Sequence, residues 1–313
     1  MNKTALLQLT LTKGIGDVAI KHVLDFMKAH GLTYEVLEQS PDAVLSGAGI
    51  RSDIARRFPE TRFQAYSLAE NLSEHGIEIL SETDADYPLY LKQTLGAGCP
   101  PVLFAKGNLS VLNQKGVGFC GSRKASQKGL DITAACARQL SEKQIAVVSG
   151  YASGVDLTAH QTTLASGGVT VFVLAEGILK MSVKAQIRDY LSDKNHVFIS
   201  QFSPRLPWTA GNAMKRNSTI IGLSRAMILI ESGRTGGTFA AGESALKAHC
   251  PLFVVDFAQP EISAEANRYF IAKGGYPVRG KNGVPNLRRV LQAVTLDNGH
   301  FQETGNEQLR IAL

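Results

Sequence analysis

Cysteine is scarce in this chain of 313 residues, and its few copies are spread widely. None of the four cysteines forms a Cys-x-x-Cys pair, and the seven histidines are equally dispersed. Disulfide frameworks and zinc sites need closely spaced ligands. The sequence therefore predicts neither a disulfide scaffold nor a metal site, and we expect no cofactor. The cysteines are Cys99, Cys120, Cys136 and Cys250.

Long apolar runs are also missing, because no stretch approaches the roughly 18 residues that a membrane span requires. Residues 1–12 lack the charged and then apolar layout of a secretory signal peptide. We therefore expect a cytoplasmic protein that makes no contact with a membrane. Charged residues make up 19% of the chain, with a net charge of +6, which is a modest hint of a polyanionic partner.

Residues 1–72 are predicted to form a small helical domain of the helix-hairpin-helix or SAM-like kind. Apolar residues recur there at three- and four-residue spacing, for example in Val18–Ala29. Gly-x-Gly turns follow at Gly14–Gly16 and Gly47–Gly49. In a helix-hairpin-helix element, backbone N–H groups at such a turn hold a DNA phosphate. The alternative is that the glycines only allow tight turns between helices.

Residues 76–282 are predicted to form an α/β domain, and residues 283–313 a short tail with one helix at Leu287–Ala293. Short apolar runs alternate here with helical stretches. This alternation is typical of a Rossmann-like, doubly wound and mainly parallel sheet with helices on both faces. The predicted strands are Ile77–Leu80, Val102–Ala105, Val117–Cys120, Ile145–Ser149, Val169–Leu174, Val197–Ser200, Ala226–Ile230 and Leu252–Val255.

A formal match to the dinucleotide pattern G-x-G-x-x-G occurs at Gly116–Gly121. That motif needs its glycines after the strand, in the turn that opens the helix. Here Gly116 and Gly118 lie before or within the apolar run, so we do not expect a nicotinamide or flavin site.

Three predicted strands end instead in small and hydroxyl-bearing residues. In a parallel sheet these loops meet at one edge, where backbone N–H groups and helix N-termini bind anions. We therefore predict a phosphate-bearing ligand there. The predicted contacts are Gly121, Ser122, Arg123, Ser149, Gly150, Ser153, Gly154, Thr235, Gly236, Gly237 and Thr238.

A basic block, Lys215-Arg216-Asn217, precedes the apolar stretch Thr219–Leu223. Arginine and lysine suit phosphate oxygens, so we add these three residues to the predicted phosphate site. We expect both basic side chains to be exposed in the free protein, so that truncating them costs little stability. The alternative is that the block is only the solvated start of a surface helix.

Two further features allow either a functional or a structural interpretation. Trp208, the sole tryptophan, has the chemistry to stack a nucleobase, but a half-buried packing role is the favoured interpretation. Asp156 and His160 fall four residues apart on one predicted helix face, as an acid–base pair would. A structural pair is favoured there, and we predict no catalytic residue.

The sequence resembles the DNA-processing (Smf/DprA) family from about Gly76 to Val255. The resemblance rests on several blocks that occur in one order along the chain. They are Asp86-Tyr87-Pro88, Pro101–Phe104 with Gly107-Asn108, Gly121–Arg123, Val148–Asp156 with Ala159-His160, Gly167–Thr170, Arg216-Asn217, Ile221–Ser224 and Glu231 before Thr235–Thr238.

The resemblance implies a recombination mediator that binds single-stranded DNA, forms a homodimer and helps to load a RecA-type recombinase during natural transformation. It also implies that Arg123, Lys215 and Arg216 contact DNA. The chain is expected to be a divergent member that lacks a C-terminal winged-helix domain.

Two other functions stay open at this point. One is a nucleotide or nucleic-acid sensor in a signalling or defence system. The other is an enzyme similar to the LOG enzymes, which cleave nucleoside monophosphates with a glutamate three residues after a Gly-Gly-Thr motif. Here Ala241 holds that position, and the next glutamate is Glu243. We therefore expect a binding protein and not an enzyme.

Overall fold

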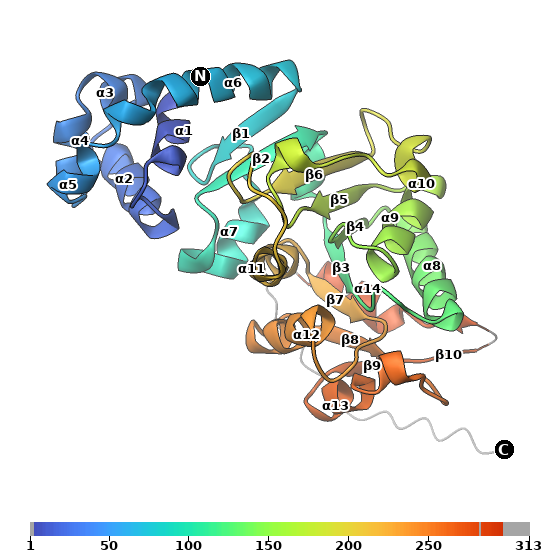
Figure 1. The fold of residues 1–313 in the computed structure, drawn as a ribbon. Helices are drawn as coiled ribbons and strands as arrows, with labels where there is room; N and C mark the ends of the chain where they lie inside the picture. Colours follow the sequence, from blue (N-terminus) through green and yellow to red (C-terminus); the bar gives the residue numbers. More distant parts are fainter. Residues whose placement is uncertain (1–2, 282, 297–313) are drawn as a thin grey trace.

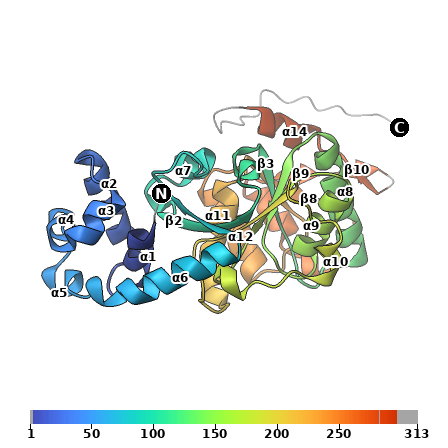
Figure 2. The same cartoon turned by 90° about the horizontal axis from the view of Figure 1, so that it is seen from above.

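The computed structural model describes residues 3–281 and 283–296, which form a nine-stranded sheet with helices on both faces and a helical region at one end (Figures 1 and 2). The helices are α1 Thr4–Leu11, α2 Asp17–Ala29, α3 Tyr34–Gln39, α4 Pro41–Gly47, α5 Ser52–Ala55, α6 Arg62–Glu74, α7 Leu89–Leu95, α8 Gln127–Glu142, α9 Val155–Ala165, α10 Ala185–Arg188, α11 Ala210–Gly222, α12 Gly237–Lys247, α13 Asn267–Ala272 and α14 Arg288–Thr295. The strands are β1 Ile77–Ser81, β2 Val102–Gly107, β3 Gly116–Cys120, β4 Ala146–Ser149, β5 Thr170–Val173, β6 His196–Ser200, β7 Ala226–Leu229, β8 Leu252–Val255, β9 Tyr276–Val278, β10 Gly280–Lys281 and β11 Val284–Pro285.

The large sheet has the strand order β1-β2-β6-β5-β4-β3-β7-β8-β9. All pairs from β6 to β9 are parallel, whereas β2 is antiparallel to both β1 and β6. The predicted α/β fold with a mainly parallel sheet is therefore confirmed, and each predicted strand lies within a residue or two of its observed position.

The order of the strands reverses between β3 and β7. From β3 the chain moves to β4 and then to β5 on one side, and from β7 it moves to β8 and β9 on the other side. In open α/β sheets, ligands bind at the carboxyl ends of the strands near such a switch point. The loops that follow β3 and β4 begin at this edge, and so does the loop that follows β7.

Each face of the sheet is covered by its own set of helices. Side chains from α7, α11, α12 and α13 pack on one face, and those from α8, α9 and α14 pack on the other. Val290 of the predicted tail helix is fully buried and belongs to the same apolar cluster as Phe253 of β8. Residues 288–295 are thus part of the folded core, and residues 297–313 of the predicted tail lie outside the described residues.

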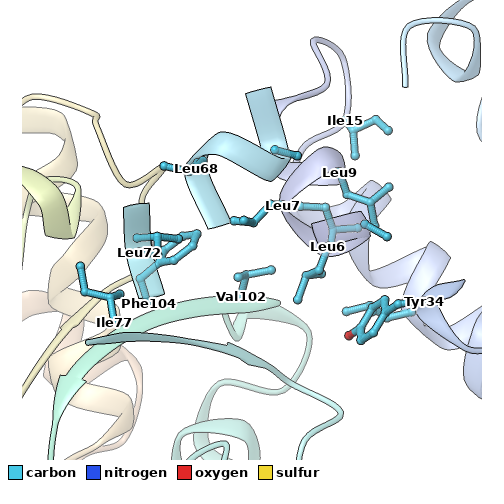
Figure 3. Close-up of a cluster of buried hydrophobic side chains, with 14 of the residues drawn as sticks. Leu6, Leu7, Leu9, Ile15, Tyr34, Leu68, Leu72, Ile77, Val102 and Phe104 are labelled. Carbon is cyan, nitrogen blue, oxygen red and sulfur yellow. The ribbon is translucent and has the colours of Figure 1, made fainter. Parts of the chain in front are cut away.

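The N-terminal helices share an apolar cluster with the edge of the sheet. Leu6 of α1 and Leu72 of α6 pack with Val102 and Phe104 of β2, as Figure 3 shows. Each of these four side chains is at most 5% exposed. The helical region therefore rests on the edge of the sheet through a continuous hydrophobic contact, which stabilises its position there.

Among the described residues, no helix combines the length and the apolar character needed to cross a membrane. Within residues 3–281 and 283–296, no group of three or more His, Cys, Asp or Glu side chains is arranged to hold a metal ion.

Candidate nucleic-acid interface

A cavity of about 220 Å³ opens at the carboxyl ends of β3, β4 and β5. Three basic side chains and two aromatic side chains contribute to its lining, together with one carboxylate. The lining residues are Arg123, Tyr151, Ala152, Ser153, Leu174, Ala175, Glu176, Lys184, Trp208 and Arg216. Loops from three strands and one helix therefore converge on a single basic site.

The loops after β3 and β4 lie against one another. The backbone N–H of Val155 donates to the carbonyl of Ser122 at 3.3 Å. Gly154 adopts a φ of +75°, and a Cβ at this position would lie 2.4 Å from the same carbonyl oxygen. Only glycine combines this backbone conformation with such a close approach. The expected meeting of the two loops is thus present in the structure.

Arg216 is buried beneath this cavity, with only 7% of its surface exposed. The expectation that its side chain is exposed in the free protein is wrong. Arg216 is on the same face of α11 as Ile220, four residues later, and this face packs against the sheet. Its Nη1 donates to the carbonyl oxygen of Val173 at 2.7 Å, at the end of β5.

The guanidinium of Arg216 is incompletely satisfied. Its Nε is among the few buried side-chain nitrogen and oxygen atoms of the described residues without a hydrogen-bond partner. A buried donor left unpaired costs about 1–3 kcal/mol, so such groups in native proteins call for an explanation. Burial also lowers the pKa of Arg216, while the neighbouring Asp156 opposes that shift.

Asp156 is a buried acidic residue whose electrostatic attraction acts on Arg216. Burial raises the pKa of its carboxyl group, and the attraction of Arg216 acts in the opposite direction. The carboxylate accepts hydrogen bonds from the Ser149 hydroxyl at 3.0 Å and from the Ala152 N–H at 3.3 Å. These bonds fix the loop after β4, which is a structural role.

His160 is fully buried behind the same loop. Its Nε2 lies 2.6 Å from the carbonyl oxygen of Gly150, and its Nδ1 lies 2.6 Å from the Thr170 hydroxyl. Burial lowers the pKa of His160 to about 3, so the ring is neutral at physiological pH. Because a carbonyl oxygen can only accept, Nε2 carries the proton and donates to Gly150, so the imidazole supports the loop after β4.

Gly150 makes room for the side chains of Arg216 and Asp156. A Cβ at Gly150 would lie 2.0 Å from Nη1 of Arg216 and 2.4 Å from Oδ2 of Asp156. No side chain fits at that separation, so the guanidinium can lie against the backbone of the loop only because residue 150 is a glycine.

Arg123 and Lys184 line the accessible part of the cavity. The guanidinium of Arg123 lies over the ring of Trp208, 5.2 Å from its centroid. The Nζ of Lys184 donates to the carbonyl oxygen of Tyr151 at 2.6 Å and lies 4.3 Å from the centroid of the Tyr151 ring. Burial lowers the pKa of Lys184, and the charge of Asp156 opposes that effect.

Lys184 is a basic cavity residue that the sequence did not indicate. It lies just before α10, in a segment without the glycine or hydroxyl signature of the other loops. Only the fold brings it to the end of β4. With Lys184, three basic groups outnumber the carboxylates of Glu176 and Asp156 at this site.

The other predicted residues lie outside the cavity. Lys215 points away from Arg216 and forms an exposed ion pair with Asp17 of α2, at 2.7 Å. Asn217 donates through Nδ2 to the carbonyl oxygen of Gly237 at 3.4 Å, which links α11 to the first residue of α12. The structure thus places Arg123, Ser153 and Arg216 of the predicted set in the cavity lining, and residues 235–238 are not part of that lining.

This geometry defines a class of protein, namely a Rossmann-like binding protein with a basic cavity at its switch-point edge. The chain belongs to the family of DNA recombination-mediator protein A, whose family model matches residues 78–286. This membership confirms the resemblance to the DNA-processing proteins that the sequence indicated.

Curated relatives carry names from the same family. The chain is 26% identical to DNA processing protein DprA of Bacillus subtilis over 229 residues, which cover 72% of this chain and 74% of the relative. It is 31% identical to DprA of Streptococcus pneumoniae over 174 residues, with 55% and 60% covered. Protein Smf of Escherichia coli is 26% identical over 193 residues, and the match spans only 52% of its length.

Solved structures show the same fold. The X-ray structure of DprA from Streptococcus pneumoniae superposes with a TM-score of 0.73 at 24% identity, covering 91% of this chain and 97% of that one. DNA processing protein A from Helicobacter pylori, described with a unique single-stranded DNA binding mode, gives a TM-score of 0.54 at 22% identity and covers 66% and 92%.

Proposed function

We propose that this protein binds single-stranded DNA, with a phosphate of the strand seated in the basic cavity. The observation that carries the proposal is the Nε of Arg216, a buried cationic donor without a partner beneath a cavity that Arg123 and Lys184 also line. A phosphate oxygen is the acceptor that such a group prefers. The Helicobacter pylori relative, with its single-stranded DNA binding mode, supports the same choice of ligand.

The proposed path of the strand continues from the cavity along α11 to the N-terminal helices. Lys215 is the next basic residue on this path, and its partner Asp17 begins α2 directly after the Gly14–Gly16 turn. We propose that Ser122, Asn217 and the loop at 235–238 add hydroxyl, amide and backbone donors beside this track. In this account residues 1–72 and 76–282 act as two units that hold one strand.

The proposed cellular role is recombination mediation. The family description names a mediator of DNA recombination, and this activity requires a single strand to be held and passed on. We propose a RecA-type recombinase as the protein partner and a homodimer as the working form, placed in the cytoplasm. Stimulation of recombinase filament formation on coated single strands tests the partner, and light scattering tests the dimer.

Binding without catalysis fits the region that corresponds to the LOG active site. Ala241 is 4% exposed and packs with the apolar cluster on its face of the sheet. Glu243 interacts with Tyr269 of α13 instead. The proposed function therefore includes no cleavage of nucleoside monophosphates.

Competition binding tests the proposal. A labelled oligothymidylate should bind with an affinity that falls as salt rises, by a log–log slope of about −0.7 per neutralised phosphate. A duplex and a mononucleotide should compete poorly, because neither offers an unpaired strand with several phosphates. Tight, salt-independent binding of a mononucleotide would overturn the proposal and support a nucleotide sensor.

A pair of matched variants locates the site. Lys184→Ala should weaken binding and flatten the salt slope by about 0.7. Lys194→Ala, a change at a lysine on a turn between α10 and β6 outside the cavity lining, should leave both unchanged. Equal effects of the two changes would show that binding depends on overall charge and not on this cavity.

A further inference from the structure

Trp208 stands at the cavity with its ring half exposed, although tryptophan is usually well buried. The exposed fraction of the residue is 47%, and Trp208 is the sole tryptophan of the chain. The guanidinium of Arg123 lies over one face of this ring. A large aromatic face thus lies directly beside the basic groups that the proposed function assigns to phosphate.

The backbone on both sides of Trp208 is held in place. Before it, the carbonyl oxygens of Pro204 and Leu206 accept hydrogen bonds from the N–H groups of Leu179 and Gly177, at 3.0 and 2.8 Å. After it, the hydroxyl of Thr209 accepts from the N–H of Asn212 at 3.0 Å and caps α11. The ring is therefore presented from a fixed position, which reduces the entropy lost on binding.

We infer that Trp208 stacks on an unpaired nucleobase, so that the cavity and the ring together accommodate one nucleotide unit of the strand. The inference rests on the proposed function, since it assumes that a phosphate occupies the cavity. Arg123 connects the stacking surface with the phosphate cavity, because its guanidinium lies over the Trp208 ring and also lines the cavity. A base on Trp208 and its phosphate at Arg123 belong to the same or to adjacent nucleotides.

This arrangement selects for single strands. In a duplex each base is already stacked between its neighbours and paired, so its face is not available to a side chain without the cost of unstacking. Stacking on an aromatic ring is tolerant of sequence, because every base has a π-face. Trp208 therefore distinguishes unpaired from paired DNA without reading the sequence.

The intrinsic fluorescence of the protein reports directly on this contact, because all tryptophan emission comes from residue 208. Titration with oligothymidylate should quench or shift that emission, with the same midpoint as a labelled-DNA assay. A strand with abasic sites throughout should bind more weakly and leave the emission nearly unchanged. A duplex should also leave it unchanged.

Substitutions separate stacking from packing. Trp208→Ala should weaken oligothymidylate binding by about 5- to 140-fold, which is the range of about 1–3 kcal/mol for one base–aromatic stack. It should leave the affinity for the abasic strand close to that of the wild type. Trp208→Phe keeps an aromatic face and should retain most of the affinity. Tyr190→Ala removes an aromatic side chain that is 44% exposed and outside the cavity lining, so it is the matched control.

The outcomes distinguish the two proposals. If oligothymidylate does not bind at all, the proposed function fails and this inference fails with it. If the strand binds with normal salt dependence while its affinity for Trp208→Ala is unchanged and the emission does not respond, only the stacking role is overturned. Loss of affinity for both the normal and the abasic strand in Trp208→Ala would assign Trp208 to the support of Arg123, which also contradicts stacking.

Discussion

Replacing Arg216 should damage folding and DNA binding by separate physical routes. In wild type, Arg216 is 7% exposed, donates a hydrogen bond to the carbonyl oxygen of Val173 and attracts the buried carboxyl group of Asp156. Arg216→Met keeps much of the volume but removes the charge. If Asp156 is ionised in the folded protein, removing the cation that attracts it costs up to about 3–5 kcal/mol, since the carboxylate is left without compensation.

The size of this loss should depend on pH. Without Arg216 the pKa of Asp156 rises further, so protonation of the carboxyl relieves the uncompensated charge. The difference in unfolding free energy between Arg216→Met and wild type should therefore shrink as the pH falls. Adding Asp156→Asn removes the buried charge altogether and should restore most of the stability at neutral pH.

DNA affinity should respond differently from stability. Both Arg216→Met and the double variant lack the donor for phosphate, so both should bind oligothymidylate about 10- to 150-fold more weakly, as expected for one lost charge-assisted hydrogen bond. Urea denaturation and fluorescence anisotropy on the same samples measure the two effects. Wild-type stability in Arg216→Met, or recovered DNA affinity in the double variant, would refute this account of the site.

Three further predictions concern the surroundings of the cavity. Lys215→Ala should weaken DNA binding and flatten the salt slope by about 0.7, whereas Asp17→Asn should strengthen binding because it frees that lysine. Anisotropy titrations at several salt concentrations measure both effects. If the two variants do not change the affinity in opposite directions, Lys215 is not part of the DNA path. Gly150→Ala should lower both the melting temperature and DNA affinity, since a Cβ would lie 2.0 Å from a guanidinium nitrogen, while Gly98→Ala, where nothing lies within 4 Å, should change neither. The third prediction is the pH dependence of stability at His160, whose folded pKa is lowered to about 3. Its contribution is complete above the unfolded pKa near 6.5 and is lost as the pH falls toward 3, by up to about 5 kcal/mol. His160→Gln should show a shallower loss of stability across that range, and identical pH profiles would contradict the buried neutral ring.

The sheet could be predicted from the sequence because its strands are buried on both faces. A buried parallel strand is a short and nearly continuous apolar run, and Leu252–Val255 is observed at the predicted bounds. The short strand β9 and the β10–β11 hairpin were not predicted. β9 and the two hairpin strands have only two or three residues each, too few to give an apolar pattern, and Gly280-Lys281 of β10 is exposed.

The site was less predictable than the sheet. Glycine and hydroxyl residues at the ends of β3 and β4 indicated the edge of the sheet where the cavity opens, because those residue types recur where backbone approaches an anion. Nothing local distinguishes Lys184 from other surface lysines, and its role depends on the path of the chain between β5 and β6. The burial of Arg216 could not be predicted either, because the acidic residue that attracts it, Asp156, lies sixty residues earlier in the chain.

The most direct test of the central claim is a crystal structure of the protein with a short oligothymidylate. We predict a phosphate in the cavity, within hydrogen-bond distance of Arg216 Nε and in contact with Arg123 and Lys184. A strand bound at another surface, with the cavity free of phosphate, would contradict the claim that this basic cavity is the DNA site.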